Sequence, residues 1–268
     1  MAVAYRRAII KQMLRRVIYV AYERYLERQV RRRPMPEHVG LILDGNRRYA
    51  REMGFEDVSL GHREGAKKLD EVLAWCAELG IKVLTIWVLS TDNLMRGRGE
   101  LEGLFKVIEE KIEDLSRNPL VKKYGYRIKI IGKTEVLPER LREAAMRAEE
   151  STSSHTDHLL YVAVGYGGRE EIVEAVRKAI REKKVDDLHS LADSITADDI
   201  AVHLYTSEVP DPDLIIRTSG EIRLSGFLLW QSAYSEFYFC DALWPAFRKI
   251  DFLRAIRSYQ ERRRRFGR

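Results

Sequence analysis

The sequence predicts an α/β domain with a central parallel sheet of about six strands and helices on both faces, preceded by a basic N-terminal helix. The chain of 268 residues is 45% hydrophobic and 33% charged, which suffices for one large folded core and excludes a wholly disordered chain. Short β-branched runs alternate with longer helical patterns along the chain, and most of these runs are continuously apolar. Strands that are covered on both faces of a parallel sheet have this pattern.

Six apolar runs are predicted strands, and five longer amphipathic stretches are predicted helices. The strands cover residues 39–43, 83–89, 126–131, 159–164, 214–216 and 237–240. The helices cover residues 64–79, 100–115, 138–150, 169–182 and 250–265. No apolar stretch approaches the roughly 20 residues that a membrane-spanning helix needs.

Residues 1–33 are predicted to form a separate basic helix, and residues 34–268 the main domain, with Pro34 and Pro36 at the boundary. The helix has ten Lys and Arg against two Glu, a net charge of +8, so the remaining residues carry −2 of the overall +6. An apolar stripe at helical spacing degrades beyond Tyr22; it comprises Ile10, Met13, Leu14, Val17, Ile18 and Ala21. This helix either lies on an anionic membrane surface or packs on the main domain or a second copy, and the sequence leaves both open.

The cysteine count and the charge distribution narrow the function classes. Cys76 and Cys240 are too few for a disulfide framework or a four-thiolate zinc site, so a reducing, cytoplasmic compartment is expected. A slightly acidic main domain argues against a broad phosphate-tracking surface, and no nucleic-acid-reading motif is present. We therefore expect no nucleic acid partner.

Polar side chains follow four of the predicted strands, at the edge of a parallel sheet where ligands bind. These residues include two carboxylates, several arginines, hydroxyls, two amides and glycines: Asp44, Gly45, Asn46, Arg47, Arg48, Ser90, Thr91, Asp92, Asn93, Arg96, Gly165, Gly167, Gly168, Arg169, Arg217, Thr218, Ser219, Arg223 and Ser225. Guanidinium groups and a cation hold phosphates in proteins. The strand ends therefore predict a site for a polyanion such as a diphosphate.

Five motifs in order resemble those of the cis-prenyltransferases, the undecaprenyl and dehydrodolichyl diphosphate synthases. They are HVGLILDGNRRYA (38–50), GHREGA (61–66), STDNLMR (90–96), GYGGR (165–169) and RTSGEIRLSGFLLWQSAYSEFYF (217–239). The resemblance covers residues 35–267. It implies a Mg²⁺-dependent homodimeric enzyme that adds isopentenyl diphosphate repeatedly to an allylic diphosphate, farnesyl or geranylgeranyl, with Z double bonds. The long polyprenyl diphosphate would be the precursor of a lipid glycosyl carrier.

The motif positions imply roles for individual residues. Asp44 would bind Mg²⁺ beside the allylic diphosphate and assist departure of diphosphate, and Glu236 would complete the metal shell. Asn93, with Ser90, would lie at the C2 proton that isopentenyl diphosphate loses. The implied substrate-binding residues are Gly45, Asn46, Arg47, Arg48, Tyr49, His62, Ser90, Thr91, Asp92, Arg96, Arg217, Arg223, Leu224 and Ser225. Among these, Arg217, Arg223 and Ser225 would hold isopentenyl diphosphate. The C-terminal Arg265-Phe266-Gly267 would reach a neighbouring subunit.

Several departures from the bacterial pattern make the chain similar to archaeal or eukaryotic single-subunit members. Arg47 replaces a common Gly, Tyr49 and Leu94 each replace a Trp, and Gly226 stands where Asn is frequent. The helices at 64–79 and 100–115 are expected to line an apolar tunnel for the product.

Other interpretations of the same residues stay open. In one of them, Arg217 forms a structural ion pair with Glu221 and binds no substrate. In another, Glu236 is a charged residue on an edge strand and binds no metal. For the whole chain, the alternatives to an enzyme are a non-catalytic partner subunit of a heteromeric cis-prenyltransferase and a nucleic-acid-binding protein.

Overall fold

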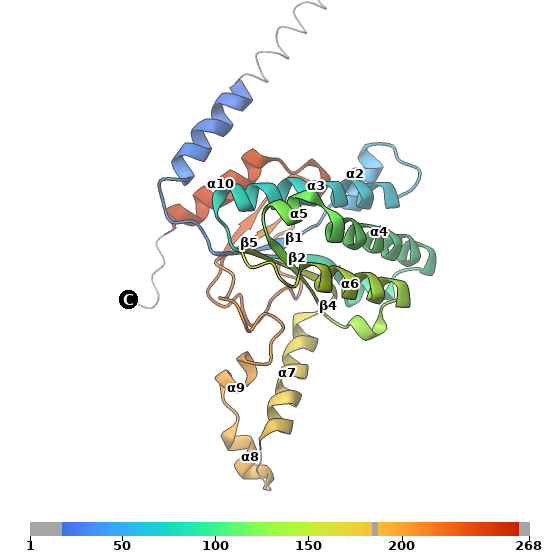
Figure 1. Ribbon diagram of the computed structural model, residues 1–268, viewed down its shortest axis with the longest axis vertical. Coiled ribbons are helices and arrows are strands. Elements are labelled where there is room, and N and C mark those ends of the chain that lie inside the picture. The colour runs from blue at the N-terminus through green and yellow to red at the C-terminus, as the bar shows by residue number, and fades with distance from the viewer. Residues whose placement is uncertain (1–17, 184–186, 263–268) are drawn as a thin grey trace, which may run out of the picture.

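In the computed structural model, which describes residues 18–183 and 187–262, six parallel strands form one sheet in the order β3-β4-β2-β1-β5-β6 (Figure 1). The strands are β1 His38–Ile42, β2 Val83–Ser90, β3 Tyr126–Ile131, β4 His158–Tyr166, β5 Leu214–Arg217 and β6 Glu236–Phe239. Each predicted strand is present, with bounds that differ by one or two residues at most. The predicted fold class is confirmed.

The five predicted helices are also present, and four short ones lie outside the predicted ranges. The helices are α2 Asn46–Glu52, α3 Ser59–Leu79, α4 Arg98–Arg117, α5 Pro119–Lys123, α6 Glu139–Thr152, α7 Gly168–Glu182, α8 Leu188–Ser194, α9 Ala197–Ala201 and α10 Lys249–Glu261. The additional α2, α5, α8 and α9 have seven residues or fewer. Helices this short do not present two turns of apolar periodicity, which is the signal that sequence analysis uses.

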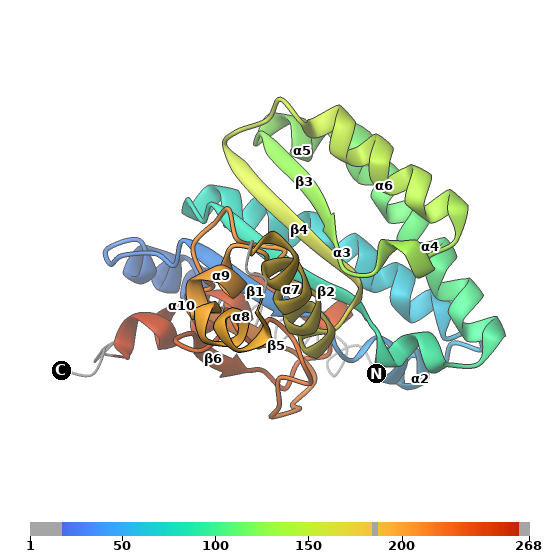
Figure 2. The same ribbon diagram turned by 90° about the horizontal axis from the view of Figure 1, so that it is seen from below.

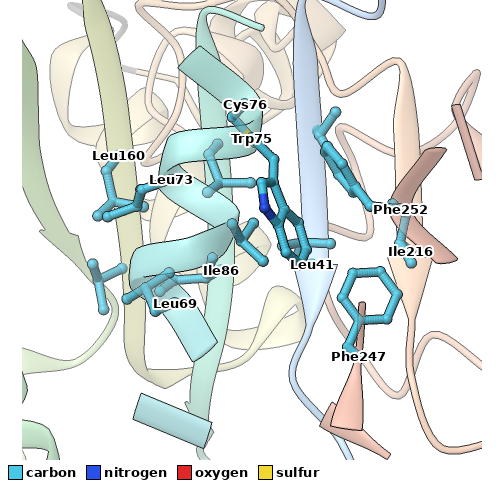
Figure 3. Packing of buried hydrophobic residues seen from close by; sticks show 14 of the residues in the cluster. Leu41, Leu69, Leu73, Trp75, Cys76, Ile86, Leu160, Ile216, Phe247 and Phe252 are labelled. Carbon is cyan, nitrogen blue, oxygen red and sulfur yellow. The ribbon is translucent and has the colours of Figure 1, made fainter. Parts of the chain in front are cut away.

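The larger core lies on the face of the sheet that α3, α4, α6 and α10 cover (Figure 1). Helix α3 packs there because Leu69, Val72, Leu73 and Cys76 recur every three or four residues and are buried. Figure 3 shows Leu69 and Leu73 beside strand residues Ile86 and Leu160, with Trp75 toward Phe247 and Phe252 of the C-terminal part.

The opposite face is covered first by the segment after β5 and then by α7, α8 and α9. Phe227 of that segment stacks on Trp87 of β2, with 5.4 Å between ring centroids, and belongs with Leu228 to a second buried cluster. In Figure 2, viewed from this side, α7, α8 and α9 lie in front of the strands. Helices therefore occupy both sides of the sheet, as predicted.

The described part of the N-terminal helix is helical from residue 18 to 30 and is docked on the main domain. Leu26 and Val30 are fully buried, and the Gln260 side chain donates to the Val30 carbonyl at 3.0 Å. Arg31 donates to the Glu78 carbonyl at 2.8 Å. Ile18 and Ala21 of the predicted stripe are exposed, and the buried face of the helix is a different one, formed by Leu26 and Val30, which sequence analysis did not single out.

Most of the predicted apolar stripe, from Ile10 to Val17, lies outside the described residues. Among the helices that the structure describes, none is long and apolar enough to span a bilayer.

Candidate active site

The carboxyl ends of β1, β2 and β5 meet at one cleft with a volume of about 620 Å³. The strand register brings them together, because Ile42 of β1 aligns with Trp87 of β2 and with Arg217 of β5. Thirteen predicted site residues line this cleft: Asp44, Gly45, Asn46, Arg47, Arg48, His62, Ser90, Asp92, Asn93, Arg96, Arg217, Arg223 and Ser225. The rule that ligands bind at the carboxyl ends of parallel strands thus located the cleft correctly.

Asp44 is held at the end of β1 by two donors. Its Oδ2 accepts from Arg217 Nη2 at 2.8 Å, and its Oδ1 accepts from the Gly45 N–H at 2.7 Å. Burial acts to raise the pKa of Asp44, but the hydrogen bond and charge of Arg217 outweigh it and hold the pKa below its usual range. The side chain is 35% exposed, so an ionised carboxylate faces the cleft at neutral pH.

Gly45 is required by the turn between β1 and α2. Its φ of 106° lies in the left-handed region, and a Cβ added there would approach Leu243 Cδ2 to 2.9 Å. A side chain at this position would therefore be strained and would displace Asp44 beside it.

Arg217 connects Asp44 to the segment after β5. Its guanidinium is 5% exposed, and Nη1 donates to the Arg223 carbonyl at 2.6 Å and to Ser225 Oγ at 2.8 Å. Ser225 has φ 52° and Ser219 has φ 81°, which are left-handed values that side chains rarely adopt. This segment is therefore a strained loop held in one conformation by a buried arginine.

The cleft is rich in guanidinium groups. Six arginines line it: Arg47, Arg48, Arg51, Arg96, Arg217 and Arg223. Three carboxylates line it with them, Asp44, Asp92 and Glu221, so positive charge is in excess and favours a polyanion. Arg51 and Glu221 are lining residues that sequence analysis did not assign.

Two carboxylates each bridge a pair of these arginines. Glu221 pairs with Arg223 and, at 3.6 Å, with Arg48. Glu100 lies 3.2 Å from Arg96 and 3.4 Å from Arg47. The expected alternative pairing of Arg217 with Glu221 is wrong, since Arg217 pairs with Asp44 instead.

Asn93 and Ser90 fix each other at the end of β2. The Ser90 N–H donates to Asn93 Oδ1 at 3.3 Å, and the Asn93 N–H donates to Ser90 Oγ at 3.0 Å. This closes the turn into the short 3₁₀ helix Asp92–Met95. Thr91 contributes its backbone rather than a cleft surface, with its N–H donating to the Tyr166 carbonyl at 3.1 Å.

His62 lies where the cleft meets a second, apolar cavity. Burial, together with the positive charge of Arg96, lowers the pKa of His62 to about 4, against a smaller opposite effect of Glu100. The imidazole is therefore neutral at physiological pH. Its buried Nε2 has no hydrogen-bond partner among the described residues.

The apolar cavity lies between α3 and α4 above β1 and β2 and has a volume of about 60 Å³. Leu43, Asn46, His62, Val88 and Leu104 line both this cavity and the cleft. The remaining lining residues are Gly65, Ala66, Leu69, Ile86, Val107, Ile108, Lys111, Ile112, Leu115, Val162 and Trp244. The predicted helices 64–79 and 100–115 thus line an apolar space that adjoins the polar cleft.

Glu236 is not part of the cleft. It is the first residue of β6 and aligns with Leu214, which aligns with Val39. It therefore lies three residues, about 10 Å, back along the sheet from the level of Ile42. Its carboxylate pairs with Arg262 at 2.7 Å. Within one chain Glu236 therefore lies away from Asp44, and its part in a shared metal shell stays a prediction.

Two other predicted binding residues also lie elsewhere. Tyr49 packs edge-on against Phe55, with 6.3 Å between ring centroids, and Leu224 packs against the second buried cluster. Among the described residues, no three His, Cys, Asp or Glu side chains are grouped so that they could hold a metal ion by themselves. Arg265-Phe266-Gly267 lies outside the described residues.

Comparisons with known proteins agree with this geometry. The family model described as "Putative undecaprenyl diphosphate synthase" matches residues 42–267. The chain is 53% identical over 257 residues to a (2Z,6E)-farnesyl diphosphate synthase of Thermobifida fusca, covering 95% of this chain and 99% of that protein. It is 48% identical over 265 residues to a geranylgeranyl-diphosphate-specific tritrans,polycis-undecaprenyl-diphosphate synthase of Methanopyrus kandleri, covering 98% and 97%. The crystal structure of lavandulyl diphosphate synthase from Lavandula x intermedia has a TM-score of 0.79 and 37% identity, covering 87% of this chain and 99% of that chain.

Proposed function

Because the chain belongs to the undecaprenyl diphosphate synthase family and is a cis-prenyltransferase that elongates prenyl diphosphates, we propose that it adds isopentenyl diphosphate to a farnesyl or geranylgeranyl primer. The observation that carries this proposal is the junction of two unlike spaces. A cleft lined by six arginines opens beside an apolar cavity, with His62 and Leu104 in the walls of both. This combination suits a molecule with a diphosphate at one end and a hydrocarbon at the other.

The allylic diphosphate is assigned to the side of the cleft formed by α2. Arg47 and Arg48 extend from this helix and pair with Glu100 and Glu221, which a diphosphate would replace. Negative charge develops on the departing diphosphate as its bond to the allylic carbon breaks, and fixed guanidinium groups stabilise that charge. The prenyl chain then extends past His62 into the apolar cavity.

Isopentenyl diphosphate is assigned to Arg223 and Ser225. Arg217 holds both through its bonds to the Arg223 carbonyl and Ser225 Oγ, so it acts chiefly by positioning. Asn93, fixed by Ser90, lies in the same cleft and is assigned to the C2 proton that leaves when the new carbon–carbon bond forms.

Magnesium fits this donor set. Mg²⁺ is usually bound by one or two carboxylates together with substrate phosphates, and not by a cage of protein ligands alone. Asp44 is the ionised carboxylate that would hold it, because Arg217 keeps its pKa low. When bound, the ion would neutralise charge on the diphosphate. Glu236 is left out of this assignment, since it lies at the other end of β6.

The test is incorporation of labelled isopentenyl diphosphate by the purified chain with Mg²⁺ and one primer at a time. The proposal expects primer-dependent formation of polyprenyl diphosphates, the kind of product from which lipid glycosyl carriers are made. A non-catalytic partner subunit would incorporate no label when it is alone, and that outcome would overturn the proposal.

We also propose a homodimer that contacts the membrane peripherally on its cytoplasmic side. Exposed apolar side chains support both the dimer and the membrane contact. They are Leu188 on α8, Val202 directly after α9, and Ile18 and Tyr25 on the N-terminal helix. Deleting residues 1–17 retains the docked residues 18–33. We expect this deletion to leave catalysis in detergent intact and to reduce co-sedimentation with anionic vesicles. Unchanged sedimentation would contradict the membrane assignment, and a monomer in light scattering would contradict the dimer.

A further inference from the structure

We propose that Thr218 is a positioning residue for the reaction, because its buried hydroxyl holds the main chain of Asp44 and thereby aims the Asp44 carboxylate into the cleft. The inference rests on the proposed function, in which Asp44 would hold the metal ion. It adds a residue that has no contact with the ligands. Thr218 is 1% exposed, does not line the cleft and is assigned to no substrate or metal ion.

The main chain of Asp44 leaves the sheet and needs partners outside β1. The ladder of β1 with its two neighbours ends at Ile42, which aligns with Trp87 of β2 and with Arg217 of β5. Gly45 then turns the chain with its left-handed φ. A main-chain N–H and C=O without strand partners must find hydrogen bonds elsewhere. The orientation of Asp44 therefore depends on neighbouring segments.

The Thr218 hydroxyl bonds to both of these main-chain groups. The Asp44 N–H donates to Thr218 Oγ1 at 3.0 Å. Thr218 Oγ1 lies 2.7 Å from the Asp44 carbonyl oxygen and 3.2 Å from that of Ile42, so it donates to the nearer one. A hydroxyl can accept and donate at the same time, which an apolar side chain of the same size cannot do. One hydroxyl thus fixes both polar groups of the Asp44 main chain.

Arg217 and Thr218 hold Asp44 from opposite faces of the sheet. Side chains along β5 alternate between the two buried clusters, with Ile215 in the second cluster and Ile216 in the larger core. By the same alternation, Arg217 lies on the side of Ile215 and Thr218 on the side of Ile216. Arg217 pairs with the carboxylate and Thr218 bonds to the main chain, so Asp44 is held in one orientation.

Two variants remove the hydroxyl while the Asp44 main chain keeps other partners. Its N–H also lies 3.0 Å from the Ile42 carbonyl, and its carbonyl accepts from the Trp244 N–H at 3.0 Å, so we expect the fold to tolerate the change. Thr218→Val retains the shape of the side chain but presents a methyl group in place of the hydroxyl, and Thr218→Ala leaves that place empty. Thr218→Ser retains the hydroxyl and loses only the methyl group.

Thr152→Val is a matched control. Thr152 of α6 is also 1% exposed, and its Oγ1 accepts from the Ile128 N–H at 3.0 Å and donates to the Ala148 carbonyl at 2.8 Å. It therefore joins two main-chain groups in the same way, but these belong to β3 and α6, and it does not line the cleft. Loss of stability from a missing buried hydroxyl would affect Thr152→Val and Thr218→Val alike.

The first experiment is steady-state kinetics with both substrates. We expect Thr218→Val and Thr218→Ala to lower kcat roughly 10-fold or more, because a misplacement of about 1 Å can lower a rate by about 10²-fold. KM for each substrate should change far less, since the arginines of the cleft are intact. We expect Thr218→Ser to recover most of the lost kcat and Thr152→Val to match the wild type.

The second experiment reports the position of Asp44 without turnover. Binding of inorganic diphosphate is measured by calorimetry with and without Mg²⁺. Without the ion, we expect the wild type and Thr218→Val to bind diphosphate equally, because the arginines that line the cleft are the same. With the ion, the variant should bind diphosphate more weakly than the wild type, since the carboxylate that would share the ion is displaced. General weakening of the cleft would change both measurements.

Several outcomes would overturn the inference. They are a kcat near that of the wild type in both hydroxyl-free variants, an equal loss in Thr152→Val, and a loss of diphosphate binding that does not depend on Mg²⁺. A loss of kcat in Thr218→Val but not in Thr218→Ala would assign the effect to the added methyl group and would also contradict it.

Folding and the proposed function are scored separately. If one hydroxyl-free variant does not fold, the other decides; if neither folds while Thr152→Val does, Thr218 is a structural residue and the inference is wrong. Absence of incorporation by the wild type overturns the proposed function, and the diphosphate titration then still tests the position of Asp44.

Discussion

Replacing Arg217 with alanine removes the side chain that joins Asp44 to the segment that bears Arg223 and Ser225. Three hydrogen bonds from a charged donor are lost, at 2.8 Å to Asp44, 2.8 Å to Ser225 and 2.6 Å to the Arg223 carbonyl. A hydrogen bond to a charged group contributes about 1.5–3 kcal/mol. If only the bond to Asp44 acts in the transition state, kcat/KM falls roughly 10- to 200-fold.

The same substitution changes the pH dependence of kcat/KM, and the structure determines the direction of this change. Burial acts to raise the pKa of Asp44, and Arg217 is the main group that lowers it. Without Arg217 the pKa of Asp44 rises, so the carboxylate becomes protonated at a higher pH and the acid limb of kcat/KM moves toward neutral. In the wild type, a carboxyl with a lowered pKa stabilises the fold above its unfolded pKa, and this stability is lost as the pH falls through the folded value. The variant lacks that contribution.

The assay is kcat/KM for both substrates from acid to neutral pH, with Arg51→Ala as the control. Arg51 also lines the cleft, so its loss removes the same positive charge without touching Asp44. We expect Arg51→Ala to weaken substrate binding and to leave the acid limb in place. An acid limb that does not move in Arg217→Ala, or that moves equally in both variants, would refute the account of Asp44.

The remaining predictions concern three other side chains. Asp44→Ala is expected to lower kcat by about 10²–10³, because the charge that faces the ligand is removed, and to lower Tm, because the buried Arg217 loses its paired carboxylate; steady-state rates within a few-fold of wild type would contradict it. Arg223→Ala should raise KM for isopentenyl diphosphate more than KM for the primer, by the loss of about 1.5–3 kcal/mol; the reverse pattern in initial-rate measurements would exchange the two diphosphate sites. Leu26→Ala should lower the free energy of unfolding by about 2–5 kcal/mol in denaturant titrations, because Leu26 is fully buried against the main domain; an unchanged midpoint would mean that the N-terminal helix is not part of the cooperative fold.

The position of the cleft could be predicted from the sequence because the polar residues that line it follow the ends of the predicted strands. Asp44 and Arg217 come directly after apolar runs, and Asn93 comes four residues after another. Parallel strands carry such residues to one edge of the sheet. Nothing beyond the strand pattern was needed to bring these three together. Their distances from one another depend only on a register that buried strands specify strongly.

Glu236 shows where that reasoning fails. It belongs to the same motif as Arg217 and Arg223, but it begins a strand rather than ending one, so the register carries it away from the cleft. The docked part of the N-terminal helix was missed for a different reason. Leu26 and Val30 lie among arginines whose charged ends reach solvent or partners. The sequence around these two apolar residues is therefore too charged to indicate that they pack on the main domain.

The ion pairs of Glu100 with Arg47 and of Glu221 with Arg48 have no signal in the sequence. Each glutamate is an ordinary surface residue by its context, and only the fold brings it between two arginines from separate segments. Long-range ion pairs of this kind have no periodic signal in the chain.

The most direct test of the central claim, that the cleft of this chain holds both diphosphates and joins their carbon skeletons, is a single-turnover measurement. Enzyme in excess over labelled primer is mixed with isopentenyl diphosphate and Mg²⁺, and the products are separated over time. The account predicts conversion of the primer into a species longer by one isoprene unit with a Z double bond, and loss of this conversion in Asp44→Ala. Primer that remains unchanged in the presence of folded wild-type protein would contradict it.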